Sequence, residues 1–189
     1  MQVKEILKLV CTLLGKEELL GSQYFDENGS ELTDAQSGDL NKMLDCLNSI
    51  TEEIAMGYLP LLKQKEVTFV NGKILVSDID NDIFAIESIK TISGKNLKYK
   101  YLKDEIVCLV GRAIITYKIH PTALSLTSDA ESFGNRLSAR ILAYGVASEY
   151  CYIEMLYDDA TIWETRFKNA LLYSSEKRGE LNLKQRGWY

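Results

Sequence analysis

The sequence has few of the residues and motifs that enzymes and metal proteins use for chemistry. It contains one histidine and four cysteines among 189 residues. No two cysteines lie within a few residues of each other, so neither CxxC redox chemistry nor a zinc ribbon is available. Each cysteine stands in an apolar stretch, which is typical of reduced, buried thiols in a cytoplasm. The cysteines are Cys11, Cys46, Cys108 and Cys151.

Phosphate-binding and calcium-binding motifs are incomplete. The Gly-Lys pairs at Gly72 and Gly94 lack the glycine that a phosphate-binding loop needs five positions earlier. The acidic run DIDND at 78–82 begins like a calcium loop, but isoleucines occupy the positions of its glycine and glutamate. His120 precedes a proline at a strand end, where a lone histidine is more often structural than a base or a ligand. We therefore expect no catalytic residue, no metal site, no cofactor and no enzyme activity.

Long apolar runs are also missing, and the charge is distributed unevenly. No run approaches the length of a membrane span, and Met1 leads into an amphipathic stretch, so we expect neither a signal peptide nor a membrane contact. Residues 1–60 carry 4 basic and 11 acidic side chains, whereas residues 88–120 carry 7 basic and 2 acidic ones. This polarity suits a subunit that meets different partners on different faces, and it does not suit a general nucleic-acid binder.

Apolar spacing of the helical period predicts helices near both ends of the chain. Thr33 to Gln36 has the spacing of a capping box, which predicts the start of the second helix. That helix should end at Leu59, because the residue before a proline avoids the helical region. The predicted helices span residues 3–14, 33–59, 129–156 and 159–178.

The middle of the chain has the pattern of antiparallel strands. Its runs are rich in β-branched residues and are bounded by Gly, Asn or Asp. Asn71-Gly72 predicts a tight hairpin turn between strands 67–70 and 74–77. The fold class is therefore α+β: a helical bundle built from N- and C-terminal helices, with a central antiparallel β insert. The predicted boundaries are 1–62 and 122–180 for the bundle and 63–121 for the insert.

Glu149 is a carboxylate among apolar neighbours in the last helical hairpin. A buried carboxylate without a partner would be costly, so it should be neutral or paired. When the hairpin is folded about a turn at 157–158, Arg166 falls opposite, and we expect a structural Glu149–Arg166 ion pair. The alternative is a small enzyme that uses Glu149 together with Tyr144 or Tyr152.

The stretch KNLKYKYLK at 95–103 interleaves lysines with tyrosines. On a strand the lysines at 98 and 100 share one face and the tyrosines the other, which is typical of a half-buried edge strand protected by lysine. The alternative is that Lys98, Lys100 and Lys103 contact DNA or a neighbouring protein.

The end of the chain mixes apolar, aromatic and basic residues. Gly179 should end the last helix, because glycine favours the left-handed turn that follows a helix. Residues 181–189 are too short for a core of their own, and we expect them to extend from the body and to be held by another chain. The alternative is that Trp188 folds back onto the bundle. The residues expected to dock are Leu183, Lys184, Arg186, Trp188 and Tyr189.

The hairpin also carries a resemblance to a known family. The segment LSARILAYGVASEYCYIEMLYDDATIWETRFKNALL has Gly-Val-Ala before Glu-Tyr and Trp-x-x-Arg-Phe after the turn. It resembles the closing hairpin of tailed-bacteriophage head–tail adaptor (connector) proteins of the tail tubular protein A type. Three other segments agree with this likeness, which covers most of the chain from Leu40 onward: LNKMLDCLNSITEEIAMGYLPL, ITYKIHP and LKQRGWY.

The resemblance implies a structural protein of the virion without catalytic activity, made in the host cytoplasm. Such adaptors form a homo-oligomeric ring, a dodecamer, beneath the portal protein. The ring encloses the DNA exit channel, joins the portal to the next tail component, and lets DNA pass without sequence-specific binding. The C-terminal segment of these adaptors inserts into the portal. A cytoplasmic helical scaffold with a cellular protein partner would have a similar sequence pattern and stays the alternative.

Overall fold

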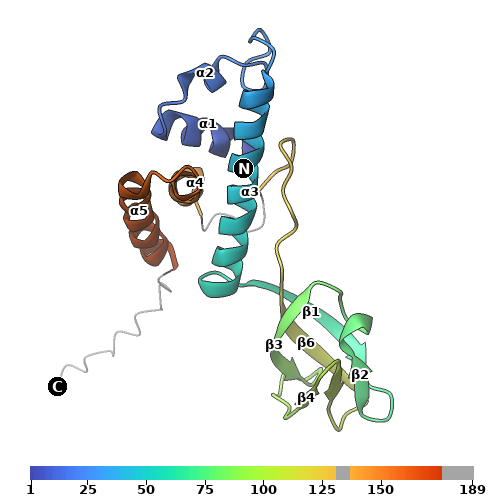
Figure 1. Ribbon diagram of the computed structural model, residues 1–189. Coiled ribbons are helices and arrows are strands. Elements are labelled where there is room, and N and C mark those ends of the chain that lie inside the picture. Colours follow the sequence, from blue (N-terminus) through green and yellow to red (C-terminus); the bar gives the residue numbers. More distant parts are fainter. Residues whose placement is uncertain (131–136, 176–189) are drawn as a thin grey trace, which may run out of the picture.

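The computed structural model describes residues 1–130 and 137–175 and has the predicted α+β class. Helices from the two ends of the chain pack together, and a block of two small antiparallel sheets lies between them in the sequence. The β block extends from the lower end of the long helix α3, below the helical body (Figure 1). Within the described ranges no helix combines the length and the apolar character needed to cross a membrane.

The N-terminal half of the helical body contains two helices that the apolar pattern predicts and one that it misses. The capping box before α3 is confirmed, since the Thr33 hydroxyl accepts from the Gln36 amide at 3.3 Å and the Gln36 side chain accepts from the Thr33 amide at 3.0 Å. The missed helix is a single turn between Gly15 and Gly21, where the sequence predicts no helix. The helices are α1 (Val3–Leu13), α2 (Glu17–Leu20) and α3 (Asp34–Gly57).

The C-terminal half is a helical hairpin of α4 (Ala139–Ile153) and α5 (Tyr157–Ser175). The predicted start of α4 at residue 129 is wrong. Ser138 is extended, with φ −88° and ψ 153°, and its side chain accepts from the Ile141 amide at 3.4 Å, so the helix begins after this cap. Asp129 forms a β-bridge with Gln2 instead. The predicted end of α5 near 178 lies outside the described residues.

The β block consists of two three-stranded antiparallel sheets. One sheet has the strand order β1-β6-β3 and contains the three longest strands: β1 (Leu61–Thr68), β6 (Arg112–Ile119) and β3 (Ile83–Lys90). The other has the order β2-β5-β4 and contains three short strands: β2 (Lys73–Leu75), β5 (Glu105–Val107) and β4 (Lys100–Leu102). A short 3-10 helix, η1 (Val76–Asp78), follows β2.

The Asn-Gly turn forms, but the predicted hairpin around it does not. Asn71 and Gly72 have φ of 52° and 76°, and Val70 and Lys73 exchange two backbone hydrogen bonds of 3.0 Å each. The pairing ends there, because β1 pairs along its whole length with β6 while β2 pairs with β5. The turn therefore passes the chain from one sheet to the other, and the prediction that residues 67–70 pair with 74–77 is wrong.

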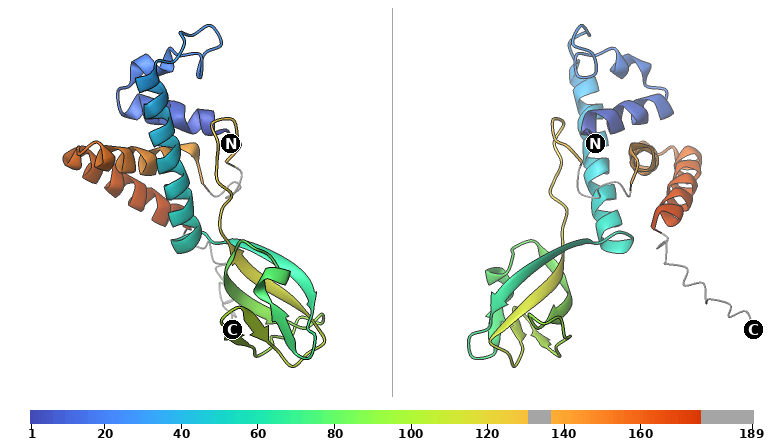
Figure 2. Two further views of the ribbon diagram at one scale, coloured as in Figure 1. Left: turned by 45° about the vertical axis from the view of Figure 1, so that its right-hand side comes forward. Right: turned by 180° about the vertical axis from the view of Figure 1, so that it is seen from behind.

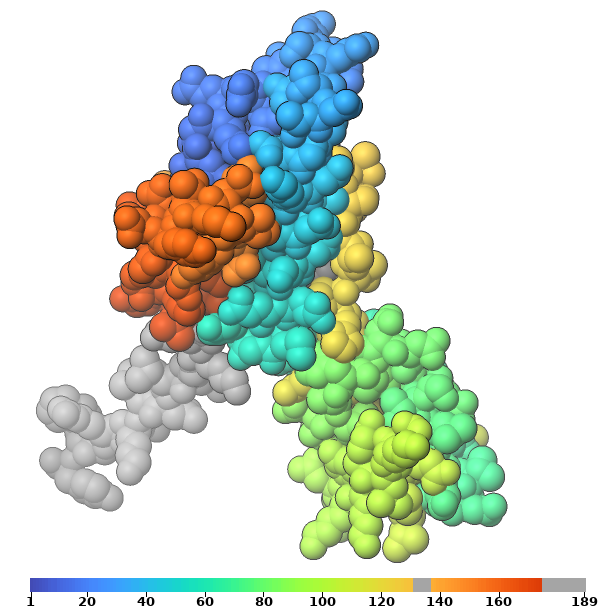
Figure 3. All heavy atoms as spheres, in the orientation of Figure 1, coloured from blue at the N-terminus to red at the C-terminus, as the bar shows by residue number. Residues whose placement is uncertain are grey.

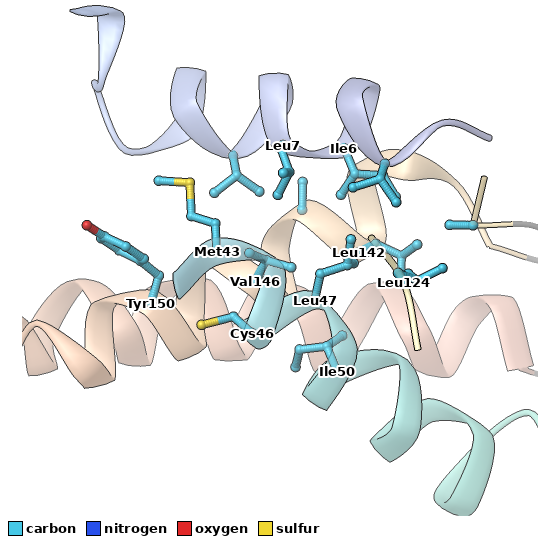
Figure 4. Close-up of a cluster of buried hydrophobic side chains, with 14 of the residues drawn as sticks. Ile6, Leu7, Met43, Cys46, Leu47, Ile50, Leu124, Leu142, Val146 and Tyr150 are labelled. Carbon is cyan, nitrogen blue, oxygen red and sulfur yellow. The ribbon is translucent and has the colours of Figure 1, made fainter. Parts of the chain in front are cut away.

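The helical body and the β block each have a hydrophobic core of their own. In the helical core, side chains from α1, α3 and α4 converge, and the segment after β6 adds Leu124 (Figure 4). The core therefore combines residues that come before the β block in the sequence with residues that come after it. The labelled members are Ile6, Leu7, Met43, Cys46, Leu47, Ile50, Leu124, Leu142, Val146 and Tyr150.

The segment between β6 and α4 runs back along α3 and is fixed by hydrogen bonds (Figure 1). The Asn48 amide group donates to the Leu124 carbonyl at 3.2 Å and accepts from the Leu124 amide at 2.7 Å. The Tyr24 hydroxyl donates to the Leu126 carbonyl at 2.8 Å. These bonds satisfy backbone groups of an irregular segment and fix it against the helical body.

Candidate functional site

The predicted ion pair between Glu149 and Arg166 is absent from the ion pairs of the described residues. The guanidinium of Arg166 lies instead 4.9 Å from the centre of the Trp163 ring, and Arg166 is exposed. The predicted turn at 157–158 lies too late in the chain, because α4 ends at Ile153 and Met155 adopts a left-handed φ of 60°. With the turn centred near Met155, position 149 lies opposite Thr161 rather than Arg166.

Aromatic and cationic side chains stack across the two helices of the hairpin. The Tyr144 ring on α4 stacks on the Trp163 ring on α5, with centroids 5.8 Å apart and planes at 20°. Arg140 lies 5.8 Å from the Tyr144 centroid on one side, and Arg166 covers Trp163 on the other. Such cation–π contacts at exposed sites typically contribute about 0.5–1 kcal/mol each. Tyr144 and Arg166 are therefore engaged in this stack.

Glu149 is half-buried and surrounded by carboxylates. Burial raises its pKa above the ordinary value, and the charges of Glu53 on α3 and Glu164 on α5 add to the rise. Glu164 itself is bound, because it accepts from the Tyr152 hydroxyl at 2.9 Å and pairs with Lys168. The structure therefore brings neither tyrosine of the enzyme hypothesis into a hydrogen bond with Glu149.

Other candidates for chemistry lie apart from one another. In residues 1–130 and 137–175, no group of His, Cys, Asp and Glu is arranged to hold a metal ion. His120 contacts Glu52 at 3.2 Å and the Phe84 ring at 5.0 Å, in a partly exposed position. All four cysteines are free and buried, and burial raises the pKa of Cys11 to about 11 and that of Cys46 to about 12.

The predicted lysines lie along the edge of the smaller sheet. Lys100 is in the edge strand β4, Lys98 precedes that strand, and Lys103 follows it with a left-handed φ of 51°. All three are exposed, and the ion pairs of the described part of the chain include none of them. The predicted docking residues Leu183, Lys184, Arg186, Trp188 and Tyr189 lie outside the described residues.

The closed end of the hairpin exposes a run of apolar side chains, which we call the hairpin tip. Its members are Ile153, Met155, Leu156 and Tyr157, exposed by 52%, 74%, 51% and 61%. Figure 2 shows the tip projecting sideways, away from α3. A contiguous apolar surface of this kind on a folded protein indicates a binding surface.

The tip is held in place by hydrogen bonds and by a chain of ion pairs at its base. The Leu156 amide donates to the Cys151 carbonyl at 2.8 Å, which closes the turn. Glu154 pairs with Lys42 on α3 at 2.7 Å, and Asp39 pairs with Lys16 at 2.5 Å and with Lys42 at 3.9 Å. Burial alone would raise the pKa of Asp39, but the Lys16 ammonium, the nearby Tyr150 hydroxyl and the charge of Lys42 together outweigh burial, and the pKa is lowered. The apolar tip is thus presented on a fixed base.

Sequence reasoning assigned the tip to the ends of two helices and missed it as a surface. One signal was present: a tight turn between helices normally carries polar or glycine residues, whereas this one carries Met155, Leu156 and Tyr157. A comparison with protein-family models and with curated proteins found no match for this chain.

Proposed function

We propose that this protein is a head–tail adaptor of a tailed bacteriophage. It is a structural protein without catalytic activity, made in the host cytoplasm and working in the virion. Its copies form a ring beneath the portal protein, enclose the DNA exit channel and join the portal to the next tail component. The C-terminal segment 181–189 of each copy docks on the portal.

The observation that carries this proposal is the hairpin tip. Its apolar side chains are held outward by the turn at Met155 and by the ion pairs of Glu154 and Asp39. Natural monomers avoid such surfaces because they promote association, so a rigid, projecting apolar end favours a subunit that assembles. The tip also belongs to the segment whose spacing resembles the closing hairpin of the adaptor family.

The arrangement of the two parts supports the same function. An adaptor must contact different partners at different levels of the assembly. Here the helical body and the β block have separate cores and extend along one long axis (Figure 3). Residues 1–60 are strongly acidic, whereas the block contains the basic stretch 88–120, so the two parts offer different surfaces.

The test is assembly with the portal. The purified full-length protein is mixed with the portal protein encoded in the same genome, and the mixture is examined by sedimentation and by negative-stain electron microscopy. We expect a ring of this protein stacked coaxially on the portal ring. A protein that stays monomeric at high concentration and does not co-sediment with the portal would contradict the proposed function.

The C-terminal docking role is tested with a truncated chain. Deletion of residues 181–189 should leave the melting temperature of the body unchanged and should reduce portal binding at least tenfold. A matched control replaces Trp188 alone by alanine, which should weaken binding while keeping the length of the tail. Undiminished portal binding by a well-folded truncation would exclude this role for the tail.

A further inference from the structure

The small sheet β2-β5-β4 has one face toward the core of its block and one toward solvent. Directly opposed residues and every second residue along a strand share a face. Ile106 at the centre of β5 is fully buried, so the face that it shares with Ile74 is the inner one at β5 and β2, while Tyr101 on the edge strand β4 is 53% exposed. The other face, which we call the outer sheet face, consists of Lys73, Leu75, Lys100, Leu102, Glu105 and Val107.

The outer sheet face has exposed apolar side chains and a hollow at its side. Leu75 is 44% exposed and Leu102 is 53% exposed, on the two outer strands. Beyond Leu75 lies a surface hollow of about 250 Å³, whose rim includes the 69%-exposed Val70. The hollow is large enough for one unbranched apolar side chain. Its lining is Thr68, Val70, Lys73, Ile74, Leu75, Asp78 and Glu105.

Positive charge on this face lies along one edge, whereas the charged side chains nearer the middle form an ion pair. Lys73 pairs with Glu105 across the face at 3.0 Å. Along the β4 edge, Lys98, Lys100 and Lys103 are exposed and enter none of the ion pairs found in residues 1–130 and 137–175. The face therefore combines two exposed leucines and a neutralised ion pair with a cationic edge.

The hairpin tip has the complementary character. Met155 is the most exposed member of the tip, and its backbone has a left-handed conformation that is unfavourable for methionine. Strained backbone conformations of this kind cluster at functional positions. Asp158 and Asp159 follow in the first turn of α5, both exposed and absent from the ion pairs of the described residues. The tip is thus an apolar projection with an anionic edge.

The two surfaces of one chain lie far apart. The hairpin tip projects to one side of α3, while the β block extends from the lower end of that helix, and both views in Figure 2 separate them. A contact between them within one chain would require the body to come apart. A contact between two copies requires no change in either.

We propose that the hairpin tip of one copy docks on the outer sheet face of the next copy, with Met155 entering the hollow beside Leu75. This inference rests on the proposed function, because it names the contact that joins neighbours in the ring. Asp158 and Asp159 then face the lysines of the β4 edge, which stabilises the contact and fixes its orientation. Since the tip and the sheet face are different surfaces, the contact is heterologous, and its repetition gives a ring when the rotation from one copy to the next closes.

A second copy fits the outer sheet face better than DNA does. The face carries an exposed leucine on each outer strand and the Glu105 carboxylate on the central strand, which match neither the charge nor the polarity of a phosphate backbone. The lysines lie at one edge only, where they can pair with a few carboxylates. DNA binding by this edge is accordingly the competing outcome of the test.

The test on the tip uses Met155→Gly in the full-length protein. Glycine accepts the left-handed conformation, so this variant keeps the turn and removes only the apolar projection. We expect an unchanged or raised melting temperature and a dissociation constant for self-association raised at least tenfold. Self-association equal to that of the wild type would overturn the proposal.

The test on the sheet face uses charge exchange. The pair Lys100→Glu with Lys103→Glu should prevent assembly, and combining it with Asp158→Lys and Asp159→Lys should restore assembly. Lys90→Glu with Lys95→Glu is the matched control, because these exposed lysines of the same block lie outside the outer sheet face. The proposal would be overturned if the variant with all four substitutions failed to assemble, or if the control lost assembly to the same extent. It would also be overturned if Lys100→Glu with Lys103→Glu assembled normally but no longer bound DNA in a gel-shift assay.

Mixing the two kinds of variant separates this proposal from the proposed function. Met155→Gly lacks a working tip and Lys100→Glu with Lys103→Glu lacks a working sheet face, so a mixture should give 1:1 dimers and nothing larger. Full rings formed by either variant alone would overturn this contact while leaving the adaptor function intact. A wild-type protein that never assembles, alone or with the portal, would overturn both.

Discussion

Gly145 lies where α4 crosses α3 and α5, and replacing it by alanine tests the packing of the helical body. A Cβ atom at this position would meet Ile50 Cγ2 at 2.9 Å, Ile50 Cδ1 at 3.1 Å and Phe167 Cε2 at 3.1 Å. Ile50 and Phe167 are each only 2% exposed, and an isoleucine in a helix strongly prefers one χ1 rotamer. The neighbours therefore have little room to move aside.

Two effects of opposite sign compete in Gly145→Ala. Alanine in a helix interior is more favourable than glycine by about 0.5–1 kcal/mol, whereas overpacking a dense core costs about 1–3 kcal/mol. The steric effect should prevail, with a net loss of about 0.5–2 kcal/mol in the free energy of unfolding. For a chain of 189 residues this corresponds to a drop in melting temperature of about 1–8 °C.

Thermal and urea unfolding of the full chain, followed by circular dichroism, measure the change. Gly38→Ala on α3 is the matched control, since a Cβ there meets nothing within 4 Å, and it should raise the melting temperature. In an Ile50→Ala background the cost of Gly145→Ala should shrink, which a double-mutant cycle detects. If Gly145→Ala were as stabilising as Gly38→Ala, the close helix crossing described above would be refuted.

Three further predictions concern the α4–α5 hairpin. The pKa of Glu149 is raised in the fold by burial and by the charges of Glu53 and Glu164, so the charged form of Glu149 opposes folding. Glu149→Gln should therefore raise the melting temperature at pH 7. This gain should vanish as the pH falls below about 4.5, because the carboxyl group is then protonated in both the folded and the unfolded state. A lower melting temperature of the glutamine variant at pH 7 would contradict this sign. The buried Tyr150 hydroxyl lies close to Lys16 and Asp39 but makes no hydrogen bond of normal geometry with any described residue, so Tyr150→Phe should leave the urea midpoint unchanged or slightly higher, and a marked loss would reveal a bond there. Arg166→Met should cost only the cation–π contact with Trp163, about 0.5–1 kcal/mol in urea unfolding, and a loss of 3 kcal/mol or more would indicate a buried ion pair after all.

Local signals predicted much of the fold. The capping box at Thr33 and the Asn71-Gly72 turn each depend on a few adjacent residues, and both form as expected. The order of helices, strands and helices followed from the helical apolar period near both ends and from β-branched runs bounded by Gly, Asn or Asp in the middle. These features are encoded locally, so no knowledge of distant contacts was needed to find them.

Features set by distant contacts or by rare backbone conformations were not predictable in the same way. The partner of β2 is β5, about 30 residues further along, and the hairpin rule for Asn-Gly contains no information about that choice. The left-handed φ of Met155 is uncommon for methionine, so the turn could not be placed from residue type. A shift of the turn by two to three residues moved the residue opposite Glu149 from Arg166 to Thr161, which is why the ion pair was predicted and does not form.

The register between the first and last strands of the β block has a consequence for how the helical body is assembled. Leu61 at the start of β1 is the direct partner of Ile119 at the end of β6, so the chain enters and leaves the block at neighbouring points. Before the block folds, the two halves of the helical core are separated by a loop of about 60 residues. Pairing of β1 with β6 shortens this loop to a few residues. The shorter loop lowers the entropic cost of bringing the two halves together by about 2 kcal/mol. The whole β block is synthesised before α4 and α5. If it folds as a unit at that stage, its paired first and last strands hold the end of α3 close to the point where the later hairpin begins.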